Sequence, residues 1–221
     1  MRVDPHSPQI PGIPGLDRIP EGVAVIAREN TGNLPHPDQI SYYVLENERK
    51  LYLDEDIGDG VLTLQRLILR WNMEDRGKPA EERTPIRLYI FSYGGDVDYM
   101  WSLIDAIESS VTPVYTCDMG VAASAAALIF LAGHRRMMLK RAKLVIHEGS
   151  ARMSGDSTKV LDASDSYRKV IKKMKDYILE RTNISAAVLN RQKSHDWELD
   201  ADYCAEHGVC DGIVESLDEI I

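Results

Sequence analysis

The sequence predicts an α/β fold on a mainly parallel sheet, and three observations lead to this prediction. Short apolar runs typical of buried strands alternate with segments whose apolar residues recur at helical spacing. Such alternation requires crossover helices between parallel strands. With 44% hydrophobic residues in 221, the chain can bury one sizeable core without disulfides. We find no dividing linker and expect one domain over residues 23–221, preceded by a proline-rich arm at residues 1–22.

The first half of the chain contains the clearest alternation. We expect strands at residues 42–46, 50–53 and 86–91, and helices that include the apolar residues of 62–71 and 97–107. A polar stretch at residues 74–84 ends the first of these helices. The sequence Ser-Tyr-Gly-Gly-Asp at residues 92–96 is expected to form the turn between the third strand and the second helix.

The second half repeats the unit of strand, turn and helix. We expect a strand at 113–117, a turn at 118–120, a helix at 122–132, strands at 137–139 and 143–146, and a loop at 148–156. A long helix follows, whose inner face is expected to be Val160, Ala163, Tyr167, Ile171, Met174 and Ile178. A short helix at 186–192, a helix capped by Asp200 that ends near Gly208, and a strand at 212–214 complete the chain.

Charge and composition exclude several classes of function. The net charge of −9 argues against a nucleic-acid partner, because phosphate binding relies on an excess of Lys and Arg. The three cysteines are too few for a disulfide framework, and the sequence has neither a signal segment nor a membrane span, so we expect a cytoplasmic protein. Cys204, His207 and Cys210 offer three zinc ligands without an obvious fourth, so no metal or cofactor is expected.

Three polar residues could form a nucleophilic site. Ser124 lies among small residues where a glycine-led turn precedes an apolar helix, although it lacks the Gly-x-Ser-x-Gly pattern. His147 ends an apolar strand, and Asp196 lies in a polar segment. Each residue alone also fits a structural role, as a buried serine, a structural histidine or a solvated carboxylate. Together they supply a nucleophile, a base and an orienting acid.

The pair Gly94-Gly95 follows the predicted strand at 86–91. In open α/β sheets ligands gather at the carboxyl ends of strands, so this turn lies where a site is expected. The pair does not match a dinucleotide-binding fingerprint. It is either a tight turn or a place where backbone N–H groups approach a substrate.

These residues together resemble the ClpP proteolytic subunits of the Clp protease, which have the ClpP/crotonase fold. Ser-Tyr-Gly-Gly at 92–95 is similar to that family's Ser-Pro-Gly-Gly turn, and Gly-Val-Ala-Ala-Ser at 120–124 to its nucleophile turn. Lys-Leu-Val-Ile-His147 resembles the strand that ends in its catalytic histidine, and the segment around Asp196 its aspartate loop. The resemblance runs collinearly from about residue 42 to residue 221.

The resemblance implies the fold and the roles of single residues. The fold would consist of repeated strand-strand-helix units with a protruding handle at about residues 148–182. Ser124 would be the nucleophile, His147 the base and Asp196 the orienting acid. The backbone N–H groups of Gly94 and Ala125 would form the oxyanion hole, and Gly95, Asp96 and Val97 would pair with an extended peptide.

The resemblance also implies partners. These are homo-oligomeric heptameric rings stacked as a tetradecamer, an AAA+ Clp unfoldase ATPase, and protein or peptide substrates.

The chain departs from the family pattern at Tyr93, at Ala125-Ala126 and at Glu148-Gly149, and its proline-rich arm does not resemble the family's axial loop. The prediction is a divergent serine endopeptidase. Two alternatives stay open, a ring subunit without activity and a crotonase-type acyl-CoA enzyme.

Overall fold

The computed structural model describes residues 42, 44–149, 154–192 and 196–221. The chain divides into two compact units, residues 1–51 and 52–221. The predicted boundary between an arm of residues 1–22 and a domain of residues 23–221 lies outside the described residues. In the first unit, residues 42 and 44–47 are helical, so the strand predicted at 42–46 is wrong. A run of only a few apolar residues does not distinguish a strand from a turn of helix.

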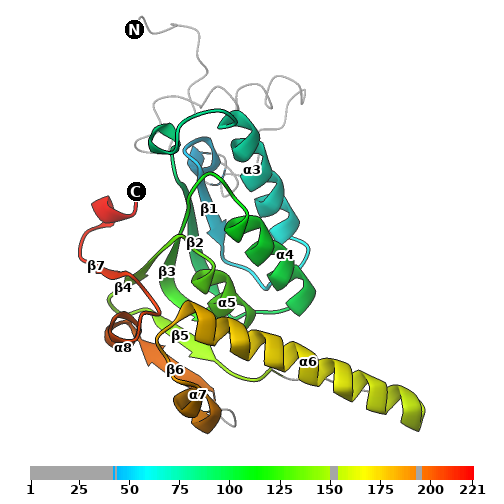
Figure 1. The fold of residues 1–221 in the computed structure, drawn as a ribbon. Coiled ribbons are helices and arrows are strands. Elements are labelled where there is room, and N and C mark those ends of the chain that lie inside the picture. Colours follow the sequence, from blue (N-terminus) through cyan, green and yellow to red (C-terminus); the bar gives the residue numbers. More distant parts are fainter. Residues whose placement is uncertain (1–41, 43, 150–153, 193–195) are drawn as a thin grey trace, which may run out of the picture. The chain divides into compact units, whose positions relative to one another are not determined.

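The chain forms a predominantly parallel sheet, whose strands from residue 86 onwards lie in the second unit (Figure 1). Five strands follow the order β1 (Lys50–Leu53), β2 (Ile86–Ser92), β3 (Val114–Ala123), β4 (Arg135–Leu139) and β7 (Gly212–Val214). Strand β5 (Lys143–Ile146) pairs with β3, and β6 (Trp197–Asp200) pairs with β5. The pairs β2–β3, β3–β4, β3–β5 and β4–β7 are parallel, and β5–β6 is antiparallel. The predicted α/β class with a mainly parallel sheet is confirmed.

Three helices build the core with the sheet. Helix α3 (Val61–Glu74) packs on α4 (Val97–Glu108), α4 packs on α5 (Ala125–Leu131), and α5 packs on β3. Every residue of α5 is buried, because its small alanines allow close approach to the sheet and its larger residues fill the interior. The largest fully buried side chains include Ile86, Leu88, Ile90, Met100, Leu103, Ile104, Ile107, Leu128, Ile129 and Phe130.

Strand β3 is longer than predicted, and this correction bears on the site. The turn expected at residues 118–120 and the helix start at residue 122 are wrong, because the strand continues to Ala123. The register between β2 and β3 shifts there, so that Ile90 pairs with Asp118 but Ser92 with Ala122. This bulge lets β3 pair with β4 through its first half and with β5 through its second. Of the residues that suggested a turn, Asp118 still pairs with Ile90, and Gly120 lies in the bulge that follows.

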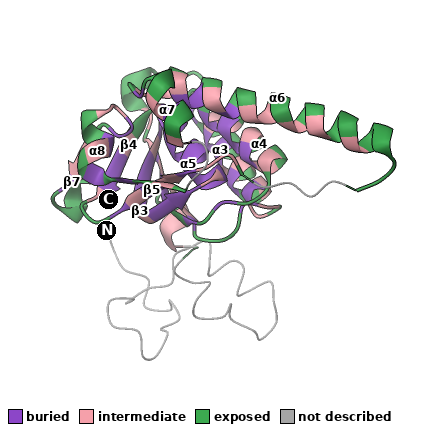
Figure 2. Cartoon of the chain, turned by 90° about the horizontal axis from the view of Figure 1, so that it is seen from below, coloured by how far each residue is buried: buried purple, intermediate pink, exposed green. Residues whose placement is uncertain are grey.

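Helix α6 (Ser157–Arg181) is the long helix that the sequence predicts, and it extends past the sheet (Figure 1). Only its last third is well buried, at Met174, Tyr177 and Ile178, whereas its first half is largely exposed (Figure 2). The predicted inner face is therefore correct only near the sheet: Val160 is half-buried and Ala163 is exposed.

The described elements after α6 follow the expected order, with two additions, strand β6 (Trp197–Asp200) and the 3₁₀ helix η2 (Leu217–Glu219). Helix α7 (Ala186–Gln192) and helix α8 (Ala201–Glu206) form as predicted, and the Asp200 side chain caps α8 by accepting a hydrogen bond from the Tyr203 amide at 2.8 Å. Strand β6 is not among the predicted elements, because the polar residues around Asp196 do not by themselves indicate a strand. Its residues alternate between half-buried or buried and exposed, the pattern of a strand at the edge of a sheet. No described helix has the length and apolarity needed to cross a membrane.

Candidate active site

The predicted site residues come together at the ends of adjacent strands. Ser124 follows β3 directly, and its amide donates a hydrogen bond to the Val145 carbonyl of β5 at 2.8 Å. His147 follows β5 directly. Strand β6 runs antiparallel to β5 with Ile146 opposite Trp197, so Asp196 lies next to His147. Strand pairing therefore brings together three residues that are 23 and 49 positions apart in the sequence.

Ser124 occupies a strained turn between β3 and α5. Its φ of 56° and ψ of −121° lie outside the regions that residues with a Cβ prefer, at a cost of about 1–3 kcal/mol. The hydroxyl forms no capping hydrogen bond with α5. A serine on such a sharp strand-to-helix turn presents its oxygen at the edge of the sheet, as a nucleophile requires. The buried alanines on both sides allow the turn to pack against its neighbours.

Gly94 lies directly against this turn. A Cβ added to Gly94 would lie 2.7 Å from the Ser124 Cβ, 2.7 Å from the Ala123 carbonyl oxygen and 3.0 Å from the Ala125 amide nitrogen. The φ of Gly94 is +103°, so both its conformation and its surroundings require glycine. Ala125 begins α5, where a helix leaves its first amides without intrahelical partners. The two amides proposed as oxyanion donors are thus neighbours, and that of Gly94 now donates to Ser92 Oγ at 3.2 Å.

Gly95 and Asp96 already have partners within the chain. Gly95 forms a parallel bridge with Ile57, and a Cβ on Gly95 would lie 2.4 Å from the Ile57 carbonyl oxygen. The Asp96 amide donates to that carbonyl at 2.8 Å, and the Asp96 side chain caps α4 by accepting from the Asp98 and Tyr99 amides. The role of Gly95, Asp96 and Val97 in pairing with a peptide stays a prediction.

The His147 imidazole is close to the Asp196 carboxylate without a hydrogen bond between them. The distance from His147 Nδ1 to Asp196 Oδ1 is 3.9 Å, and the Asp196 side chain is 79% exposed. The Gly149 amide donates to the same Nδ1 at 3.2 Å. A neutral imidazole with an accepting Nδ1 carries its proton on Nε2, which is the opposite of the tautomer that a general base for Ser124 needs. Among the described residues, His147 forms no hydrogen bond with Ser124.

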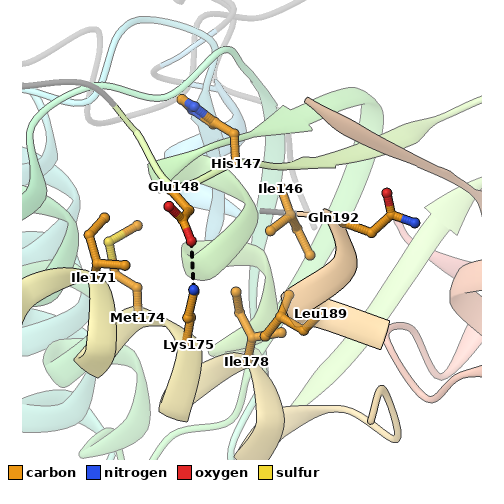
Figure 3. A pocket seen from close by; sticks show the side chains of 9 residues that line it. All are labelled: Ile146, His147, Glu148, Ile171, Met174, Lys175, Ile178, Leu189 and Gln192. Carbon is orange, nitrogen blue, oxygen red and sulfur yellow. Dashed lines mark hydrogen bonds and ion pairs between the residues drawn. The ribbon is translucent and has the colours of Figure 1, made fainter. Parts of the chain in front are cut away.

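An apolar pocket lies beneath this segment, between the end of β5 and helices α6 and α7 (Figure 3). Figure 3 shows the His147 ring turned away from the pocket and the Glu148 side chain turned into it toward Lys175. Lys175 Nζ donates to Glu148 Oε1 at 2.6 Å. The pocket is lined by Ile146, His147, Glu148, Ile171, Met174, Lys175, Ile178, Leu189 and Gln192.

The candidate zinc ligands near the C-terminus are two buried cysteines and a histidine that stacks on a tyrosine ring. Cys204 and Cys210 are buried free thiols, and burial raises the pKa of both. His207 stacks on the Tyr203 ring with 3.8 Å between the ring centroids. Within the described residues, no three His, Cys, Asp or Glu side chains are grouped to hold a metal ion.

Comparison with protein families matches residues 39–217 to the Clp protease family. The chain belongs to this family. The ATP-dependent Clp protease proteolytic subunit 2 of Treponema pallidum is 32% identical over 133 residues, which are 59% of this chain and 67% of that protein. The subunit of the same name in Corynebacterium diphtheriae is 27% identical over 178 residues, 79% of this chain and 86% of its own.

The contacts that hold the residues after His147 are not evident from the sequence. Glu148 departs from the Clp protease pattern, but its partner Lys175 lies 27 positions further on. The sequence offers two signals for this contact. They are a glutamate just after the end of an apolar strand and a lysine on the apolar face of the predicted long helix. Only the packing of α6 against the end of β5 shows that they meet.

Proposed function

We propose that this Clp protease family member is a serine endopeptidase that cleaves unfolded polypeptides or peptides through an acyl-enzyme. Ser124 Oγ attacks the peptide carbonyl carbon while His147 Nε2 accepts the hydroxyl proton. The Gly94 and Ala125 amides stabilise the oxyanion of the tetrahedral intermediate. When the C–N bond breaks, His147 returns the proton to the leaving amine. Water then hydrolyses the Ser124 ester through the same base.

One observation carries the proposal. The ends of β2, β3, β5 and β6 place Gly94, Ser124, His147 and Asp196 at one edge of the sheet, with a strained backbone at Ser124. The distances from His147 Nδ1 to Gly149 and to Asp196 describe a resting arrangement, in which the base is not yet aligned with the acid. For His147 Nδ1 to donate to Asp196, the Gly149 amide must leave that nitrogen. Catalytic hydrogen bonds are often long without substrate and tighten in its complex.

The proposal includes an assembly. Relatives of the chain are named as proteolytic subunits of an ATP-dependent protease. We propose that this chain forms homo-oligomeric heptameric rings, stacked as a tetradecamer, whose chamber encloses the site, and that an AAA+ Clp unfoldase ATPase supplies substrates. The exposed first half of α6 carries Leu161, an apolar side chain that is 67% exposed in the single chain and that contact with another copy would bury. Native mass spectrometry tests the assembly, because multiples of seven 24.9 kDa chains are expected.

The test of the activity is covalent labelling of the purified protein with a fluorophosphonate, together with hydrolysis of a fluorogenic peptide. Ser124→Ala should abolish labelling and lower the peptide rate by about 10⁴-fold or more. Ser166→Ala, which removes an exposed hydroxyl on α6, is the control and should label like the wild type. Equal labelling of Ser124→Ala and wild type would disprove the assignment. A wild type that forms rings but never reacts would instead be a non-enzymatic subunit.

A further inference from the structure

Glu148 lies between His147 and the glycine whose amide binds the His147 ring. Successive side chains of strand β5 point to opposite sides up to its end at Ile146, and the next two residues continue this alternation. Figure 3 shows the result: the imidazole of His147 points away from the pocket, and the Glu148 carboxylate points toward α6. Any group that fixes residue 148 therefore also fixes the peptide units that carry the His147 ring and its Gly149 partner.

Two side chains of α6 hold residue 148 at separate points. Lys175 Nζ donates to the Glu148 carboxylate at 2.6 Å, and the Tyr167 hydroxyl donates to the Glu148 carbonyl oxygen at 3.0 Å. Burial and the nearby carboxylate raise the pKa of Tyr167, so the phenol keeps the proton that it donates. Tyr167 and Lys175 lie about two helical turns apart, which anchors the segment along the helix rather than at one point.

The ion pair lies among apolar side chains, and stability does not account for that position. The Lys175 and Glu148 side chains are 26% and 37% exposed, and Ile171, Met174 and Ile178 line the same pocket. A partly buried pair is desolvated at a cost that often cancels its Coulomb attraction, so apolar residues would serve stability as well. What the pair supplies instead is a fixed position for residue 148.

The turn after residue 148 depends on the same contacts. Gly149 has a φ of +78°, and a Cβ there would lie 3.3 Å from the Tyr167 hydroxyl oxygen. Its amide donates to His147 Nδ1, the nitrogen that lies 3.9 Å from Asp196 Oδ1. The position of Gly149 relative to the ring decides which partner Nδ1 takes.

We propose that Glu148, Lys175 and Tyr167 are positioning residues that set the orientation of His147 from helix α6. This inference rests on the proposed serine peptidase function. The three residues do not touch the reacting atoms. They hold the peptide units on both sides of residue 148, so that only the Gly149 amide has to leave Nδ1 when substrate binds. Without these contacts the segment takes many arrangements, and the fraction of molecules in which the base becomes aligned falls. A small misplacement of a catalytic group is enough to lower a rate by about 10- to 100-fold.

The kinetic test uses the full-length assembly and a fluorogenic peptide. Glu148→Gln and Lys175→Met remove the charges and keep side-chain size, and Tyr167→Phe removes one hydroxyl. Each should lower kcat about tenfold with KM within about twofold. The exchanged pair Glu148→Lys with Lys175→Glu should return kcat to within about threefold of wild type, which a purely local packing defect would not do. The matched control is Lys172→Met, which breaks the exposed Lys172–Asp176 pair on α6 and should leave kcat unchanged.

A second measurement does not depend on activity. Hydrogen exchange of the peptide that covers residues 147–149 should be faster in Glu148→Gln than in wild type, and unchanged in Lys172→Met. Unchanged exchange in Glu148→Gln would overturn the inference, and so would a rise in KM alone or an exchanged pair no better than the single variants. If the wild type fails to hydrolyse the peptide, the proposed function is wrong, and the exchange result still decides whether α6 holds the His147 segment.

Discussion

Replacing Asp118 with asparagine tests how a buried carboxylate on β3 affects stability. Asp118 is 0% exposed, and its Oδ1 accepts a hydrogen bond from the Gly120 amide at 2.9 Å. Its Oδ2 is buried and has no hydrogen-bond partner among the described residues. Burial raises the pKa of Asp118 to about 7, and the Gly120 hydrogen bond opposes this rise only in part. The charged form is therefore unfavourable in the folded protein.

The direction of the pH effect follows from proton binding. The folded state holds the Asp118 proton up to about pH 7, whereas the unfolded chain loses it near pH 3.8. Asp118 therefore makes the protein less stable as the pH rises between these values, and the loss is complete above pH 7. At about 1.4 kcal/mol for each pH unit, the full loss is about 4 kcal/mol, and about 3 kcal/mol of it falls between pH 5 and pH 8.

Asp118→Asn keeps the acceptor for the Gly120 amide and cannot ionise. At pH 8 we expect the variant to be more stable than wild type by about 1–3 kcal/mol, because the unpaired amide of asparagine costs part of the gain. At pH 5 the advantage should disappear or reverse. The assay is urea unfolding of both proteins at one protein concentration from pH 5 to pH 8, with the exposed Asp162→Asn as control. A stability difference between Asp118→Asn and wild type that does not change with pH would refute the reasoning.

Two further substitutions test the turn and the helix ends. Gly94→Ala should destabilise the fold by about 1–3 kcal/mol and abolish fluorophosphonate labelling, because its Cβ would clash with Ser124. The control is Gly77→Ala, because Gly77 also has a positive φ but lies in open space. This variant should lose stability and keep its labelling. If Gly94→Ala were still labelled, the Gly94 amide would not be part of the oxyanion hole. Arg181→Met should cost about 2–3 kcal/mol in thermal or urea unfolding, because Arg181 donates to the Leu131 and Gly133 carbonyl oxygens at the end of α5. Arg168→Met, at an exposed arginine of α6, should lower the free energy of unfolding by less than about 0.5 kcal/mol. An equal loss of stability in Arg168→Met and Arg181→Met would contradict the role of the Arg181 hydrogen bonds.

The order of elements was predictable because the periodicity of apolar residues is local information. Helices α3, α4, α6 and α7 and strands β2, β4, β5 and β7 lie where the pattern places them. The errors arise where tertiary contacts override a local signal. Asp118 and Gly120 are typical turn residues, yet β3 continues through both, with a bulge after Asp118, because it pairs with two different strands. Strand β6 exists because it pairs with β5, which no property of Trp-Glu-Leu-Asp alone reveals.

The α/β class and the residues that could supply a nucleophile, a base and an acid follow from the sequence alone, because apolar periodicity and residue chemistry are both properties of single segments. The relative positions of Ser124, His147 and Asp196 depend on the folded chain, because parallel pairing of β3 with β5 and antiparallel pairing of β5 with β6 set their distances. The same folding brings the Gly149 amide to His147 Nδ1 in competition with Asp196, and it lets α6 hold Glu148, the residue between His147 and Gly149.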